Sequence, residues 1–206
     1  MEHTADAKRS NFMRTVGRIN RGVVLTAAIF LVLVIYLIAL GLMRNAEKPA
    51  ISAIAEEYIH TETEYTMLPE DQRMITPRIS QRNLAQYGND MIRDISSYFI
   101  SKKANYEFNV NFLRESHLEQ AKGINVITES EKEILRFNSF VFDKDTVTVD
   151  VLTKYTRTTT TQNEPPIGNT VDRLMLQKVD GKWKLIYANI SYKTNNIDGE
   201  EGEVSA

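Results

Sequence analysis

The residue types that could do acid–base or metal chemistry are thinly spread along this chain. His60 and His117 lie far apart in the sequence and in no spacing that makes a metal-binding pair, so they predict surface or stem histidines. Glu129, Glu131 and Glu133 alternate with polar residues. That pattern is typical of a solvated face and not of a catalytic carboxylate pair.

Cysteine is absent, which excludes disulfides, thiolate zinc sites and a cysteine nucleophile. The sequence also lacks a G-x-S-x-G elbow, a glycine-rich phosphate loop and an H-E-x-x-H helix. We therefore predict no catalytic residue, no metal site and no cofactor, in a protein that is not an enzyme.

An apolar segment near the N-terminus predicts a transmembrane helix. Residues 22–43 contain 14 Val, Leu, Ile or Phe side chains and no ionisable side chain except Tyr36. At 1.5 Å per residue the segment is about 33 Å long, which matches the hydrocarbon core of a bilayer. A core helix would show a polar stripe, and a cleaved signal peptide would have a shorter apolar run. We therefore predict an uncleaved anchor.

Charges beside this segment predict its orientation. Only Arg44 and Lys48 follow it closely. Five cations precede it: Lys8, Arg9, Arg14, Arg18 and Arg21. By the positive-inside rule, residues 1–21 form a basic cytoplasmic tail. Beyond this tail, 20 basic and 25 acidic residues give a net charge of −5, which is unlike a nucleic-acid-binding surface.

Apolar residues at helical spacing predict two helices after the membrane segment. A stripe that includes Ile51 and Tyr58 predicts a stem helix within residues 44–68, with Pro49 at its first position. A second helix is predicted over residues 77–103.

Alternating apolar residues predict strands in the rest of the chain. The predicted strands are 106–112, 134–142, 146–156, 171–179 and 183–187. A short helix over 115–122 separates the first two. Residues 143–145 and 180–181 supply hairpin turns. Trp183, the only tryptophan, shares with Tyr187 the face of the last strand that we expect to be buried.

A threonine run between two of these strands predicts a protruding arm, because a turn-rich stretch follows it. Threonine suits an exposed hairpin arm that contacts nothing, and a long arm also suits docking on a partner. Both interpretations stay open. The candidate interaction residues are Thr158, Thr159, Thr160, Thr161, Pro165 and Pro166.

Together these elements predict an α+β protein, with helices packed on one face of an antiparallel sheet of about four strands. We divide the chain into a cytoplasmic tail (1–21), a transmembrane helix (22–43), a stem helix (44–68), an exported α+β domain (69–193) and a disordered acidic tail (194–206).

This order of elements resembles the bitopic inner-membrane assembly proteins of bacterial type IV secretion and conjugation machines. The closing hairpin, from Leu174 to Tyr187, looks like the final strands of many nuclear transport factor two-like domains. The resemblance implies a periplasmic domain with a curved sheet, anchored in the lipid bilayer. Its implied partners are other secretion-machine subunits and further copies of the same chain. The hairpin also occurs in soluble ligand-binding and isomerase relatives, so it supports the fold more than the role.

We therefore expect a structural subunit that acts through protein–protein contacts. The alternative is a membrane-tethered module that binds a small ligand or peptide in the concave face of the sheet. A third reading is an isomerase-type or hydrolytic enzyme. A scaffold predicts a filled or shallow concave face, whereas the other two predict a pocket of roughly several hundred Å³ with convergent polar groups.

A reporter fused after Ala206 tests the predicted topology. Because five cations precede the membrane segment and two follow it closely, the reporter should be active only outside the cytoplasm. A pair of fusions, to a periplasm-active and a cytoplasm-active enzyme, makes the measurement. Activity of the cytoplasmic reporter would overturn the orientation.

Overall fold

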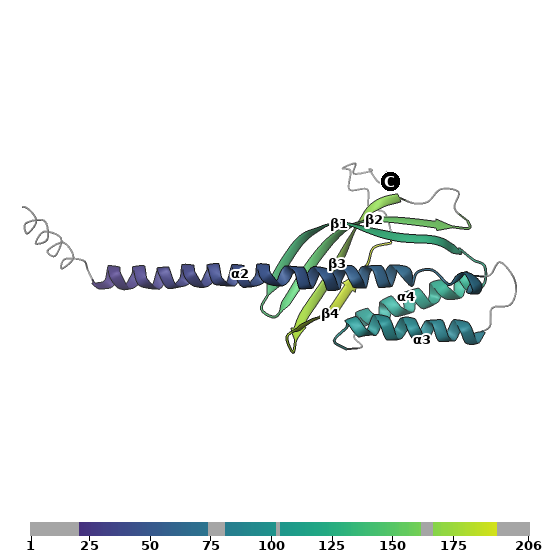
Figure 1. Ribbon diagram of the computed structural model, residues 1–206, viewed down its shortest axis with the longest axis horizontal. Coiled ribbons are helices and arrows are strands. Elements are labelled where there is room, and N and C mark those ends of the chain that lie inside the picture. The colour runs from purple at the N-terminus through teal and green to yellow at the C-terminus, as the bar shows by residue number, and fades with distance from the viewer. Residues whose placement is uncertain (1–20, 74–80, 102–103, 162–166, 193–206) are drawn as a thin grey trace, which may run out of the picture. The chain divides into compact units, whose positions relative to one another are not determined.

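The computed structural model describes residues 21–73, 81–101, 104–161 and 167–192 (Figure 1). The protein is α+β, as predicted, with a long apolar N-terminal helix followed by further helices and a four-stranded antiparallel sheet. Its elements are α2 (Arg21–Glu64), the 3-10 helix η1 (Glu70–Gln72), α3 (Gln81–Tyr98), α4 (Ala104–Ala121), β1 (Ile127–Asp143), β2 (Thr146–Thr159), β3 (Ile167–Val179) and β4 (Lys182–Asn189).

The chain divides after Glu47 into two compact units. In the first unit, α2 exposes its large apolar side chains, with Phe30 68% and Leu42 66% exposed. Among the described residues, α2 is the one helix long and apolar enough to cross a membrane. Arg21 begins α2. The other orienting cations and the predicted acidic tail lie outside the described residues: Lys8, Arg9, Arg14, Arg18 and residues 194–206.

Pro49 lies inside α2 and does not begin a helix, contrary to the prediction. Proline lacks a backbone N–H, so α2 loses the hydrogen bond that would reach the carbonyl of Asn45. The helix continues because the residues after Pro49 are held by packing, and Ile51 and Ala55 are both fully buried.

The strands follow one another in the order β1–β2–β3–β4, and each neighbouring pair is antiparallel. Both predicted hairpin turns are confirmed, since Lys144, Asp180 and Gly181 have positive φ angles of 52°, 50° and 78°. Tight hairpin turns need such left-handed residues, and Asp–Gly adopts them at little cost. The β1–β2 and β3–β4 turns lie at one end of the sheet, and the β2–β3 connection lies at the other (Figure 1).

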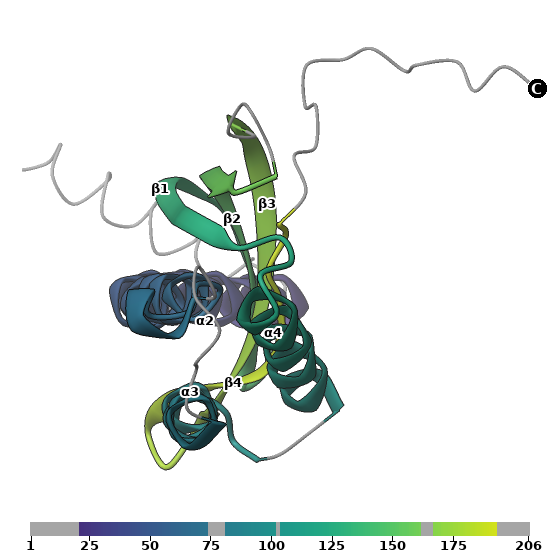
Figure 2. The same ribbon diagram turned by 90° about the vertical axis from the view of Figure 1, so that its right-hand side faces the viewer.

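In the second unit, α2, α3 and α4 pack together with the inner face of the sheet (Figure 2). The strands contribute fully buried residues at alternate positions: Val147, Val149, Val151, Leu174, Leu176 and Leu185. The α2 helix contributes Ile51, Ala55, Tyr58 and Ile59, each 0% exposed. The segment predicted as a separate stem therefore supplies part of the core, and the folded unit begins at Lys48.

The predicted strand over residues 106–112 is wrong, because these residues belong to α4, as do most of residues 115–122. Val110 and Leu113, three positions apart, are buried, whereas Phe108, which would share a strand face with Val110, is 71% exposed. The helical period is concealed because three polar residues occupy other buried positions of α4: Asn109, His117 and Gln120. Each of them makes a hydrogen bond within the fold, which compensates for its burial.

A β-bulge changes which residues of β4 face the core. Trp183 is 6% and Leu185 is 0% exposed, so their predicted burial is confirmed. The pairing with β3 shifts register after Leu185 and makes Ile186 an extra residue. Tyr187 therefore leaves the core face, contrary to the prediction, and Ala188 takes its place at 3% exposure.

Replacing Trp183 by Ala should destabilise the fold by roughly 3 to 5 kcal/mol, because truncating a buried aromatic side chain removes packing and leaves a cavity. Val179→Ala, at a position that is 38% exposed, is the control. It should change the stability by less than about 0.5 kcal/mol. Urea denaturation of the full chain, followed by circular dichroism, measures both. Equal stability of the two variants would contradict a packing role for Trp183.

Candidate functional site

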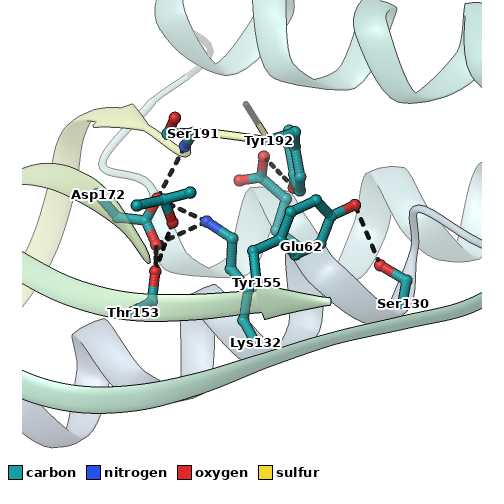
Figure 3. Close-up of polar contacts among 9 residues, drawn as sticks. Glu62, Ser130, Lys132, Thr153, Tyr155, Asp172, Ser191 and Tyr192 are labelled. Atoms are coloured by element: carbon teal, nitrogen blue, oxygen red, sulfur yellow. Dashed lines mark hydrogen bonds and ion pairs between the residues drawn. The ribbon is translucent and has the colours of Figure 1, made fainter. Parts of the chain in front are cut away.

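A buried ion pair lies on the inner face of the sheet (Figure 3). Nζ of Lys132, on β1, is 2.6 and 2.7 Å from the two carboxylate oxygens of Asp172, on β3. Both side chains are 0% exposed. Lys132 reaches across β2 to make this contact, because β2 lies between β1 and β3. Either charge alone at this depth would be strongly destabilising, so each residue depends on the other.

The Asp172 carboxylate accepts hydrogen bonds from further donors (Figure 3). Thr153 Oγ1, on β2, donates to Oδ2 at 3.0 Å, and the backbone N–H of Ser191 donates to Oδ1 at 2.8 Å. The hydroxyl of Thr170 lies 2.8 Å from that of Thr153. One carboxylate therefore connects three strands and the segment that follows β4.

The ammonium group of Lys132 also lies against two aromatic rings. Its Nζ is 5.1 Å from the ring centroid of Tyr192 and 5.6 Å from that of Tyr155. A cation is attracted to the face of such a ring. Burial lowers the pKa of Lys132, and the negative charge of Asp172 counteracts that shift. The rings and the carboxylate together replace the water that a lysine normally holds.

Glu62 of α2 is the second buried carboxyl group of this cluster. Its side chain is 2% exposed, and the hydroxyl of Tyr192 donates to Oε1 at 3.0 Å. Oε2 has no hydrogen-bond partner among the described residues. Burial raises the pKa of Glu62 to about 7, and the hydroxyls of Tyr58 and Tyr192 and the charge of Lys132 counteract it only in part. Glu62 therefore exchanges a proton near neutral pH.

We use "buried cluster" for Glu62, Lys132, Asp172 and Tyr192. These groups could transfer protons in principle, but the three charged side chains are at most 2% exposed. A general acid or base must come within hydrogen-bond reach of its substrate. The charged side chains of the buried cluster are withdrawn from solvent, and in this structure they hold strands together while Glu62 can bind a proton.

A polar cavity of about 430 Å³ opens between α4 and the ends of β1 and β2. Its lining includes Glu115 and Glu119 of α4 and Arg157 of β2. The Nε of Arg157 is buried and has no hydrogen-bond partner among the described residues. Two carboxylates and one guanidinium around such a space suit a small polar ligand that carries both charges.

Comparison of the chain with protein-family profiles, curated proteins and solved structures finds no match.

The residues of the predicted interaction arm do not form one surface. Thr158 and Thr159 belong to β2 and are paired with β1, and Thr159 is 5% exposed. Thr160 and Thr161 follow the strand and are exposed. Outside the described residues lie Pro165 and Pro166. Of the arm residues that the structure describes, Thr160 and Thr161 are the most open to a partner.

The two histidines have different surroundings. His60 is exposed, as predicted, but His117 is 3% exposed, so its predicted place at the surface is wrong. Its Nε2 lies 2.5 Å from the carbonyl oxygen of Tyr65. Burial lowers the pKa of His117, which favours the neutral ring. Within the described residues, no cluster of His, Asp or Glu side chains could hold a metal ion.

Sequence reasoning missed the buried cluster, although a signal for it exists. Lys132 lies between the exposed residues Glu131 and Glu133 and is in phase with Ile134. Asp172 is likewise in phase with the buried Leu174. Charged residues of opposite sign at the inward positions of two strands predict a buried pair. Glu62 lies three and four positions after the buried Ile59 and Tyr58, so its helical phase is a comparable signal.

Glu62 makes the stability of the fold depend on pH. Its pKa is raised to about 7 in the folded chain from an ordinary value of 4.5. The folded state therefore binds the proton more tightly than the unfolded state does. The resulting stabilisation, about 3 kcal/mol, is complete below pH 4.5 and is lost as the pH rises through 7.

We expect Glu62→Gln to remove this part of the pH dependence, and Glu131→Gln, at an exposed position, to leave it unchanged. The free energy of unfolding of the two variants and the parent is measured by chemical denaturation between about pH 5 and 8.5, in steps of roughly half a pH unit. If the parent and Glu62→Gln had parallel profiles, Glu62 would not be the proton-binding group.

Removing one partner of the buried ion pair should destabilise the fold by roughly 3 to 5 kcal/mol, because the other charge stays buried without compensation. Lys132→Met tests this, and the double variant Lys132→Met with Asp172→Leu should be less destabilised than the single variant. The control is Arg173→Met, which breaks a surface pair with Asp150 and should cost at most about 1 kcal/mol. Similar losses for Lys132→Met and Arg173→Met in urea denaturation would argue against the assigned role.

Proposed function

We propose that this protein is a single-pass protein of a bacterial inner membrane, with residues 1–21 in the cytoplasm and the folded unit in the periplasm. Support comes from the length and apolar composition of α2 and from the excess of cations that precede its apolar part. In the described part of the chain, no other helix is suited to a second crossing.

We further propose that the folded unit is a scaffold and not an enzyme. The observation that carries this proposal is the filling of the inner sheet face. The α2 helix packs there with Ile51 and Tyr58 at 0% exposure, and the ion pair of Lys132 and Asp172 is sealed beneath it. The charges of Lys132 and Asp172 on this face are bonded to each other. Such a domain offers its outer surfaces for contacts with proteins.

The proposed setting is a type IV secretion or conjugative transfer machine, in which the protein contacts other subunits and further copies of itself. The order of an apolar helix, further helices and a four-stranded antiparallel sheet supports this setting. Three register shifts in the pairing of β1 with β2 support a curved sheet of the nuclear transport factor two-like kind, because bulges bend strands. We propose no nucleic-acid contact and no cofactor.

The second candidate function is a membrane-tethered module that binds a small ligand or peptide. The polar cavity beside α4 favours it, because Arg157 lines a space of about 430 Å³ together with two carboxylates, and its buried Nε has no hydrogen-bond partner among the described residues. This cavity lies at one end of the sheet, so the module could bind a ligand without opening the buried cluster.

Three substitutions in the full chain separate these functions. Thr160→Glu places a charge at an exposed position of the arm, Arg157→Gln alters the cavity, and Asn111→Glu adds a charge at an exposed site of α4 as a control. The scaffold proposal expects Thr160→Glu alone to reduce the yield of large complexes by about tenfold, which corresponds to a loss of about 1.4 kcal/mol of association free energy. Circular dichroism should show that all three variants are folded.

The measurement is the recovery of high-molecular-weight complexes from solubilised membranes after chemical cross-linking. A loss confined to Arg157→Gln would favour the ligand-binding function. If Thr160→Glu left the yield of complexes unchanged, the arm would not be part of the proposed interface. If the parent protein gave no complexes at all, the scaffold role itself would be wrong.

A further inference from the structure

The apolar segment is joined to the folded unit by a short stretch of chain. The folded unit begins at Lys48, and the apolar segment ends at Met43. Five residues span at most about 18 Å. Under the proposed membrane anchoring, on which this inference rests, the entry end of the folded unit therefore lies within that distance of the lipid headgroups.

Both hairpin turns lie at this entry end. Lys48 Nζ is 5.5 Å from the ring centroid of Phe140, near the end of β1. Ala50 lines a surface groove together with Gly181 and Lys182 of the β3–β4 turn. The β1–β2 and β3–β4 turns are at the same end of the sheet (Figure 1). The two turns thus flank the point where α2 enters the folded unit.

We use "tip surface" for Val141 and Lys144 of the β1–β2 hairpin and Val179 and Lys182 of the β3–β4 hairpin. Val141 is 61% and Val179 38% exposed, and both lysines are exposed. Each hairpin therefore presents one valine and one lysine at the entry end. An apolar side chain beside a cation suits the bilayer interface, where the apolar group enters the headgroup layer and the cation meets phosphate.

The charges at the tips are nearly balanced, which indicates how the surface would bind. Three acidic residues accompany the lysines: Asp143, Asp145 and Asp180. A purely electrostatic attraction would therefore be weak. Insertion of the two valines and direct contacts between lysine and phosphate must supply the interaction, and tethering by α2 makes such weak contacts sufficient.

We propose that the tip surface rests on the headgroup layer of the bilayer that holds α2. Val141 and Val179 enter the interface, and Lys144 and Lys182 donate hydrogen bonds to lipid phosphates. The contact restricts how the folded unit can turn about its tether. It directs the opposite end of the sheet, which carries Thr160, away from the membrane.

The absence of cysteine from the sequence allows a direct test, because each introduced cysteine is the sole thiol. Val141→Cys, Val179→Cys and the control Thr160→Cys are each labelled with a fluorophore in the full chain. Every labelled protein is reconstituted at one chain per nanodisc in phosphatidylcholine and phosphatidylglycerol that contains headgroup-nitroxide lipid. One chain per disc removes contacts with a second copy.

Quenching should be at least about threefold stronger at residues 141 and 179 than at residue 160, because interfacial side chains lie within about 10 Å of the headgroups. Adding Lys144→Glu and Lys182→Glu to Val141→Cys should weaken its quenching. Equal quenching at the three positions, or the strongest at residue 160, would overturn the tip contact. A chain that is not retained in the discs would instead overturn the proposed anchoring, so the two failures are distinguishable.

Discussion

The contact between Lys132 and Asp172 constrains the rest of the folded unit. A one-residue slip of β1 or β3 would move one charge to the other face of the sheet and leave its partner buried alone. The pair therefore selects one register for β1, β2 and β3 together. Ser191, which donates its backbone N–H to the same carboxylate, ties the segment after β4 to that register.

The α2 helix belongs to both halves of the molecule, because it carries the apolar segment and also supplies a face of the folded core. A stripe of α2 packs on the inner face of the sheet and consists of Ile51, Ala55, Tyr58 and Ile59. Glu62 lies on the same face of α2 and belongs to the buried cluster. A spacer helix would leave that stripe to solvent or to a partner. Here the sheet is the partner, because the stripe packs in one core with the buried strand residues.

The sheet was largely predictable, because its signals are local. Asp180 and Gly181 specify a turn, and Val147, Val149 and Val151 alternate with polar residues as a half-buried strand requires. Helix α4 was not predictable from periodicity, because Asn109, His117 and Gln120 occupy buried positions that apolar residues usually fill. Hydrogen bonds to segments far away in the sequence make those positions tolerable, and no local pattern reports them.

The candidate site was less predictable than the fold. Lys132 and Asp172 are 40 residues apart, and each reads in isolation as an ordinary surface charge. Only the phase of each strand reveals that both point inward, and β1 conceals its phase because bulges interrupt its pairing. The cavity beside α4 is completed by the distant ends of β1 and β2, so the helix predicted over 115–122 gave no sign that Glu115 and Glu119 line it.

The hydrogen bond between Tyr192 and Glu62 joins an early and a late part of the chain as it is synthesised. These residues lie 130 positions apart, at the two ends of the folded unit. Since synthesis proceeds from the N-terminus, the Glu62 carboxyl group is made before the hydroxyl that donates to it. A ribosome that stops before Ser191 therefore releases a chain without the N–H that donates to Asp172 and without the hydroxyl that donates to Glu62.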